Sequence, residues 1–338
     1  MESLIEDTLA DARWFPLRFD VEREELYFVW APAELQRAVT FIADLQPAPE
    51  QLRIFPWSSI AQIAVEQAPL HFILHSGLGG STLLSRALAQ HGVVTTLKEP
   101  PILTDIIALR LRKGEQKAKS LAGDVARLLA RPFSKREAVV VKMSSVGNGL
   151  HPWLASGRST SRTLCMVTPL EDMLASLARR GAEGRAGGRK LFVGLRNSGF
   201  AQLGLDDQQL SNRSDLELAA LAWIAIQRLM ANAAARFGPQ QVRSICSRQL
   251  LGATEQSLSA IAAYFTLDLD IEGRLMSGVF RRHAKTGEPF DTLARDRLLQ
   301  DFMRSNAHEI LPIVDWAKKI AKANLVPCEL PHPLFGEQ

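Results

Sequence analysis

The sequence predicts an α/β fold in which a parallel sheet carries helices on both faces, preceded by a small α/β extension. From residue 69 onward, short apolar runs alternate with segments of helical periodicity, which is typical of strands joined by helical crossovers. The first run leads into a glycine-rich turn and a helix. The 338 residues suffice for one large domain or two small ones. We place the extension at residues 1–66 and the main domain at 67–338.

The expected elements of the main domain follow from these patterns. Short, mostly apolar strands are predicted at residues 70–74, 138–141, 163–167 and 241–245. Helical spacing predicts helices at 81–90, 169–180, 214–236 and 310–323. Residues 180–190 are rich in glycine and arginine, which predicts a mobile surface loop. In the extension, we expect a strand at 26–30 and a helix at 32–45.

The composition is that of an ordinary globular protein with a mildly basic charge. Apolar residues make up 46% of the chain and charged residues 22%. The net charge of +4 fits an anionic small ligand and is too small to indicate nucleic-acid binding. Cys165, Cys246 and Cys328 are widely spaced and predict neither a disulfide framework nor a zinc site.

Location is predicted from two absences in the sequence. Residues 1–14 are acidic and lack the apolar core of a secretion signal. No apolar run approaches the ~18 residues that cross a bilayer. We therefore expect a cytoplasmic protein without a membrane span.

The sharpest motif is the glycine-rich turn between the first apolar run and the helix behind it. Gly77, Gly79 and Gly80 let the backbone fold tightly round an anion, with amides pointing inward. The helix start adds unpaired N–H groups and a positive dipole end, and Ser81 and Thr82 add hydroxyl donors. A plain turn capped by Ser81 is the alternative. We predict a phosphate-binding loop.

This loop differs from that of the nucleotide triphosphatases. Their motif needs a lysine directly before the Ser/Thr, and here Gly80 occupies that position. Neither long strand ends in the aspartate that would help to hold Mg²⁺. Hydrolysis of ATP or GTP is therefore disfavoured, and no metal is expected.

Four segments, in this order, resemble the sulfotransferases that use 3′-phosphoadenosine 5′-phosphosulfate (PAPS). Residues 79–84 are similar to the loop for the 5′-phosphosulfate, and Lys98-Glu99-Pro100 to the Lys-Glu after the loop helix. Lys142 is similar to the lysine that closes the next strand, and residues 167–177 to the 3′-phosphate segment. The resemblance covers about residues 69–300. It implies a sulfotransferase-like fold and transfer of a sulfuryl group from PAPS to a hydroxyl or amine, with no metal required.

The resemblance also implies roles for single residues. Glu99 would take the acceptor proton, and Lys98 and Lys142 would stabilise the charge that develops as the S–O bond breaks. Ser176 would hold the 3′-phosphate. The 5′ side would be held by Gly77, Gly79, Gly80, Ser81 and Thr82.

Two cations of the family pattern are replaced here by Leu78 and Val167. Other cations must compensate, or the ligand differs. The basic stretch 281–285 loosely resembles the loop that family members fold over the nucleotide. The candidates to compensate are Arg86, Lys98, Lys142, Arg179, Arg281 and Arg282.

Alternatives remain at several positions. The alternative for Glu99 is a structural ion pair with Lys98 or another surface cation. His75 and His91 are rival candidates for the general base. Ser176 is alternatively a small residue facing another helix, and Trp223 is expected in the core. For the whole protein, the alternatives are a phosphotransferase on the same scaffold and a catalytically degenerate nucleotide binder. The acceptor and the oligomeric state are not predicted.

Overall fold

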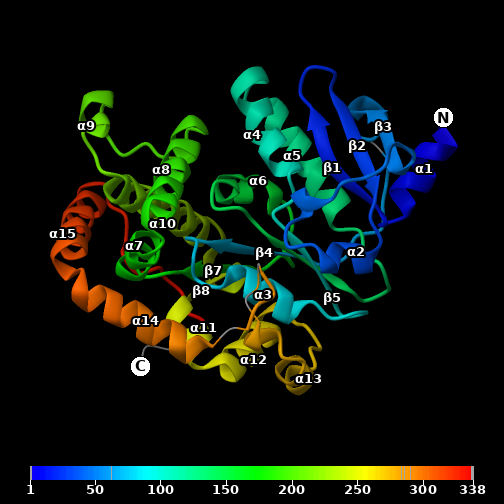
Figure 1. Cartoon of the computed structure of the whole chain (residues 1–338). Helices are drawn as coiled ribbons and strands as arrows, with labels where there is room; N and C mark the ends of the chain where they lie inside the picture. Colours follow the sequence, from blue (N-terminus) through cyan, green and yellow to red (C-terminus); the bar gives the residue numbers. More distant parts are fainter. Residues whose placement is uncertain (1, 62, 283, 285, 290, 336–338) are drawn as a thin grey trace.

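The computed structural model describes residues 2–61, 63–282, 284, 286–289 and 291–335, around a central five-stranded sheet (Figure 1). The strands lie in the order β5-β6-β4-β7-β8, and all neighbours are parallel. The predicted parallel α/β fold is confirmed. The strands are β4 (Leu70–His75), β5 (Val94–Lys98), β6 (Ala138–Lys142), β7 (Thr163–Val167) and β8 (Val242–Cys246).

The inner strands are apolar because the sheet is covered on both faces. Every residue of β4 and β6 is buried. Side chains alternate between the faces, so that Phe72 and Leu74 join one apolar cluster and Ile73 joins the other. β5 was not among the predicted strands, since Thr95 and Thr96 interrupt its apolar run. Threonine is β-branched and suits a strand even where the run is broken.

Helices form a layer on each face of the sheet (Figure 1). One face carries α3 (Ser81–Leu88), α11 (Ser247–Gly252), α12 (Thr254–Phe265) and α13 (Ile271–Met276). The other carries α4 (Ile102–Lys113), α5 (Glu115–Leu129), α6 (His151–Leu154), α7 (Leu170–Arg179), α8 (Gly181–Asn197) and α10 (Asp215–Gln241). The remaining elements here are η4 (Gly147–Leu150), α9 (Asp207–Ser211), η5 (Val279–Arg281), α14 (Thr292–Ser305) and α15 (Ala307–Ala323).

The N-terminal extension is a small antiparallel sheet with short helices (Figure 1). Its apolar side chains join the same cluster as those of α4 and α5, and Arg18 pairs with Asp105 of α4 at 2.9 Å. The extension thus packs directly on the main domain, and the boundary at residue 66 stays a prediction. Its elements are α1 (Glu2–Ala10), β1 (Trp14–Asp20), β2 (Glu25–Trp30), α2 (Ala33–Ala38), η1 (Ile42–Asp44), η2 (Pro49–Gln51), β3 (Leu52–Pro56) and η3 (Trp57–Ser59).

The helix predicted at 32–45 is wrong in its length. It ends at Ala38, and the next residue, Val39, is extended with φ −66° and ψ 145°. Val39 and Thr40 are β-branched and lose side-chain freedom in a helix, which favours an end at this point. A single 3₁₀ turn then follows at η1. Residues 39–41, in which Val39 and Phe41 are extended, lie beside the candidate site described below.

The mobile loop predicted at 180–190 is also wrong, because residues 181–190 belong to the helix α8 and Arg180 is its N-cap residue. A Cβ on Gly188 would lie 2.7 Å from that of Ala219, so this glycine permits close packing on α10. Arg185 pairs with Glu309 at 2.6 Å, and Arg189 pairs with Asp215. Helix contacts and carboxylate partners, neither visible in the local sequence, explain the composition.

The long helix α10 is largely buried and packs against α7 and α8. Ser214 caps its start in a reciprocal capping box with Glu217. Gly238, at φ 72°, interrupts the helical conformation near the predicted end. By length and composition α10 could cross a membrane, contrary to the absence of such a run expected from the sequence. However, 72% of its most apolar window is buried inside the protein, as in a core helix.

Candidate functional site

The connections that leave β4 and β7 diverge at the carboxyl ends of these adjacent strands. β4 leads to α3 on one face of the sheet, and β7 leads to α7 on the other. In open α/β sheets, ligands bind outside the carboxyl ends of strands where connections diverge in this way. The predicted phosphate loop follows β4 and therefore lies at this position.

The backbone of the loop is built for tight curvature. Gly77, Leu78 and Gly80 have φ values of 92°, 56° and 89°. Gly80 caps α3 in the left-handed conformation and has no side chain to satisfy the first amides of the helix. The amides of the first turn, which begins with Ser81 and Thr82, have no acceptor within the helix. Their N–H groups and the helix dipole favour an anion here.

Thr168, just beyond β7, fastens the loop to the sheet. Its amide donates to Ser76 Oγ at 2.7 Å, and its hydroxyl donates to the carbonyl of Gly77 at 2.7 Å. Trp223 Nε1 donates to the carbonyl of Thr168 at 2.8 Å, which adds a positioning contact to its expected place in the core. A Cβ on Gly79 would lie 2.2 Å from Thr168 Oγ1. Gly79 therefore allows the loop to pack against the end of β7.

Lys142 and Glu99 form an ion pair at the same edge of the sheet. Lys142 ends β6 and is 1% exposed, and its ammonium donates to Glu99 Oε1. Glu99 follows β5 with a φ of 55°, and its amide donates to the carbonyl of Lys142 at 2.9 Å. Lys142 also pairs in register with Ile73 of β4, the strand before the loop. The structure thus brings two sequence-predicted residues together, one strand away from the loop strand.

Lys98, the last residue of β5, is buried at 1% exposure and faces the N-terminal extension. Its Nζ donates to the carbonyl of Arg37 at 3.0 Å. Burial lowers the pKa of Lys98 to about 8, with further lowering by the charges of Arg86 and Lys142 and an opposing effect from Asp44. Arg86 of α3 donates to Thr40 Oγ1 at 3.3 Å. Two predicted cations therefore meet a segment for which the sequence suggested no role.

Ser176 is placed less favourably for a phosphate contact. It lies six residues into α7, roughly 9 Å along the helix from its start, and is 9% exposed. This supports the alternative of a small packed residue. Arg281 and Arg282 are exposed near η5, which packs against α3. His283 and Lys285 of the same basic stretch lie outside the described residues.

The rival base His75 is engaged by the backbone. Its Nε2 lies 2.9 Å from the carbonyl of Met143, so this nitrogen carries the proton and donates it. Its own carbonyl accepts from Asn148 Nδ2 at 3.0 Å. The second rival, His91, lies 3.3 Å from Arg37 through Nδ1. These contacts give His75 a role in holding the strand end.

Two arginines near the loop were missed in the sequence. Arg295 of α14 donates to the carbonyl of Leu78 at 3.4 Å. Arg248, directly after β8, pairs with Asp172 at 2.7 Å at the start of α7. β8 lies beside β7 with Cys246 opposite Val167. Both cations lie near positions where the resemblance requires a cation that the local sequence lacks. Sequence spacing gives no signal for either, because each comes from a distant element.

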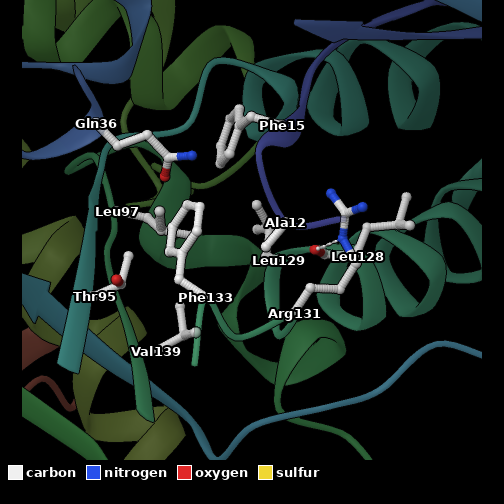
Figure 2. A pocket seen from close by; sticks show the side chains of 10 residues that line it. All are labelled: Ala12, Phe15, Gln36, Thr95, Leu97, Leu128, Leu129, Arg131, Phe133 and Val139. Carbon is white, nitrogen blue, oxygen red and sulfur yellow. Dashed lines mark hydrogen bonds between the residues drawn. The ribbon is translucent and has the colours of Figure 1, made fainter. Parts of the chain in front are cut away.

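A small cavity lies between the N-terminal extension and the strands β5 and β6 (Figure 2). Thr95 and Val139, which line it, belong to the amino-terminal halves of β5 and β6. Its volume of about 10 Å³ holds roughly one water molecule. Figure 2 shows Gln36 and Arg131 among its lining residues, with Arg131 bonded to the carbonyl of Leu128. The cavity is therefore too small for a nucleotide.

No protein-family profile matches the sequence, and no curated protein sequence matches it. Among solved structures, the chain is similar to a sulfotransferase domain from the curacin biosynthetic pathway. The TM-score is 0.45 at 15% identity, over 78% of this chain and 99% of that one. It is also similar to the sulfotransferase domain of the Synechococcus PCC 7002 olefin synthase, with a TM-score of 0.43 at 15% identity, over 79% and 98% of the chains. At such identity the likeness concerns the fold alone, and any activity has to be argued from the residues of the site.

Proposed function

We propose that the protein transfers a sulfuryl group from PAPS to a hydroxyl or amine acceptor. The observation that carries this proposal is the Lys142–Glu99 pair at the carboxyl edge of the sheet, one strand from the glycine-rich loop. A carboxylate, a buried ammonium and an anion-binding helix start are the groups that sulfuryl transfer to a protic acceptor needs.

In the proposed step, the acceptor oxygen or nitrogen forms a bond to sulfur while the bond from sulfur to the bridging phosphate oxygen breaks. The acceptor proton passes to Glu99, and adenosine 3′,5′-bisphosphate leaves with the bridging oxygen. Proton uptake neutralises Glu99, which frees the charge of Lys142 to stabilise the leaving oxygen. Lys98 adds positive charge at the same edge.

The donor would lie with its 5′-phosphosulfate on the loop at 77–82. Three backbone residues with positive φ and the first turn of α3 support this placement. Arg295 and Arg248 would supply the cations that Leu78 and Val167 do not. The charge of Arg248 is partly balanced by Asp172 and Glu171, so we assign it to orientation of the 3′ side.

The test compares two nucleotides by thermal unfolding of the whole chain. Adenosine 3′,5′-bisphosphate should stabilise the protein by ~2.7 kcal/mol at about a hundred times its dissociation constant. The melting temperature should then rise by a few degrees, with a much smaller shift from ATP with Mg²⁺. Equal shifts would favour a phosphotransferase instead. A lack of response to both nucleotides would favour a degenerate member and reject the proposal.

A further inference from the structure

The segment that follows β6 is bonded to the end of β4, the strand that leads into the glycine-rich loop. The amide of Met143 donates to the carbonyl of Ile73 at 3.0 Å. His75 Nε2 donates to the carbonyl of Met143 at 2.9 Å, and Asn148 Nδ2 donates to the carbonyl of His75 at 3.0 Å. These hydrogen bonds position residues 143–148 beside the start of the loop.

Ser145 is the residue of this segment whose side chain lies against the loop. A Cβ on Gly77 would lie 3.7 Å from Ser145 Oγ, which is ordinary van der Waals contact. Because Gly77 has no side chain, the Ser145 hydroxyl lies directly beside the loop backbone. Ser145 is half-buried, and its Oγ lies 3.5 Å from His75 Nδ1.

The protein engages the Ser145 hydroxyl only weakly. His75 Nδ1 is an acceptor, since Nε2 carries the proton, but 3.5 Å is longer than the ~2.7–3.0 Å usual for hydroxyl hydrogen bonds. The neighbouring hydroxyl of Ser144, by contrast, accepts from the amide of Gly147 at 3.0 Å. A charged oxyanion is a stronger acceptor than a distant neutral imidazole. The Ser145 hydroxyl can therefore turn from His75 to an anion at little cost.

Ser145 also lies on an informative side of the loop. It follows β6, which lies between the loop strand β4 and the strand β5 that precedes Glu99. On the other side, Thr168 follows β7, and its hydroxyl is already bonded to the carbonyl of Gly77. Ser145 thus offers a hydroxyl to the loop from the side of the Lys142–Glu99 pair.

We propose that Ser145 is a further binding residue of the donor site, whose hydroxyl donates a hydrogen bond to an oxygen of the 5′-phosphosulfate on the loop. This inference rests on the proposed sulfuryl transfer and adds a donor from outside the loop. Leu78 offers no polar side chain where the resemblance requires a cation. Ser145 supplies one of the missing contacts from the neighbouring strand.

Titration of three nucleotides against the whole chain, by calorimetry without an acceptor, tests this contact. The nucleotides are PAPS, adenosine 3′,5′-bisphosphate and adenosine 3′-monophosphate, which lacks the 5′ group. In Ser145→Ala, we expect the dissociation constant of PAPS to rise about tenfold, as for the loss of one hydrogen bond to a charged group. That of adenosine 3′-monophosphate should change by less than about twofold. An equal rise for the bisphosphate assigns the hydrogen bond to the phosphate, and a rise for PAPS alone assigns it to the sulfuryl group.

Three further variants serve as comparisons. Ser145→Thr keeps the hydroxyl and should bind PAPS within about threefold of the wild type. Ser156→Ala, at an exposed serine after α6, is the matched control and should bind all three nucleotides as the wild type does. Ser144→Ala removes a hydrogen bond within the turn. It should lower the free energy of unfolding and leave the ratio of the PAPS and monophosphate affinities unchanged.

Two results would overturn the proposal. A purely structural role of Ser145 would make Ser145→Ala lose affinity for all three nucleotides by the same factor. Unchanged affinity for all three would exclude a contact altogether. In either case, binding of PAPS by the wild type would leave the proposed sulfuryl transfer standing.

Inorganic pyrophosphate separates this inference from the proposed function in the opposite case. If the wild type binds neither PAPS nor adenosine 3′,5′-bisphosphate, the PAPS-dependent function fails, and pyrophosphate then tests Ser145 alone. Weaker binding of pyrophosphate by Ser145→Ala than by the wild type would keep Ser145 as an anion contact of the loop. Equal binding by the two proteins, or binding by neither, would reject that role too.

Discussion

Lys142 and Glu99 contact each other twice, through a side-chain ion pair and through the 2.9 Å hydrogen bond from the Glu99 amide to the Lys142 carbonyl. The backbone contact fixes the carboxylate at the strand edge, and the left-handed conformation of Glu99 turns the chain away into α4. This geometry holds a carboxylate and an ammonium group together at the carboxyl edge of the sheet.

Substitution of Glu99 tests the role of this pair. We expect Glu99→Gln to lower turnover of PAPS with a hydroxyl acceptor by about a hundredfold to ten-thousandfold. Its affinity for adenosine 3′,5′-bisphosphate should stay within about twofold, because the proposal places the phosphates on the glycine-rich loop and not on Glu99. Steady-state kinetics and nucleotide titration measure the two effects. Wild-type turnover in the variant would remove Glu99 from the mechanism.

Gly79 should be intolerant of a side chain. In Gly79→Ala the new Cβ would meet Thr168 Oγ1 at 2.2 Å and Ser247 Cβ at 2.9 Å, so the loop must shift. We expect a loss of roughly 1–3 kcal/mol in the free energy of unfolding, together with weaker nucleotide binding. Urea denaturation measures the first effect.

Gly123→Ala in α5 is the control for this substitution. A Cβ there meets nothing within 4 Å, and alanine favours the helix by about 1 kcal/mol. We expect this variant to be as stable as the wild type or more so. Similar losses in the two variants would contradict the packing argument for Gly79.

Lys98 should make stability depend on alkaline pH. Its pKa of about 8 in the folded protein is lowered mainly by burial, then by Arg86 and Lys142 against the opposing charge of Asp44. An exposed lysine in the unfolded chain titrates near 10.4. Between these values the unfolded state binds more protons, so the contribution of Lys98 to the free energy of unfolding rises with pH. Below pH 8 both states are protonated and the contribution is flat.

The comparison with Lys98→Met isolates this effect. Chemical denaturation of both proteins from pH 7 to 10.5 should show a wild-type stability that gains on the variant above pH 8. Parallel curves for the two proteins would contradict the prediction, because they would show that folding does not lower the pKa of Lys98.

Arg295 of α14 should help the glycine-rich loop to bind the nucleotide, because it donates a hydrogen bond to the carbonyl of Leu78. We expect Arg295→Met to weaken binding of adenosine 3′,5′-bisphosphate about tenfold, which is the effect of one charge-assisted hydrogen bond. Arg297→Met, at an exposed position of the same helix, should change the affinity by less than twofold. Isothermal titration calorimetry of the two variants measures the dissociation constant for adenosine 3′,5′-bisphosphate. Equal losses would indicate a general effect of surface charge.

The sequence by itself predicted the parallel sheet, and it located the glycine-rich loop and the charged residues Lys98, Glu99 and Lys142 at or just after strand ends, because these features depend on local patterns. An apolar strand, a glycine turn and a helix form a contiguous motif. The prediction from the sequence failed at residues 180–190, where glycines that suggested a loop allow close helix packing. It also failed at residues 32–45, where the helix ends at Ala38.

Only the tertiary structure decided which distant groups surround the loop. Thr168 fastens the loop, and Arg295 reaches it from α14. At the edge strand, the backbone carbonyl of Arg37 in the extension accepts a hydrogen bond from Lys98. The physical reason is that hydrogen bonds and charges act over a few ångströms in space. Which residues form these hydrogen bonds and ion pairs depends on how the helices and strands pack. The spacing of residues along the chain does not reveal that packing.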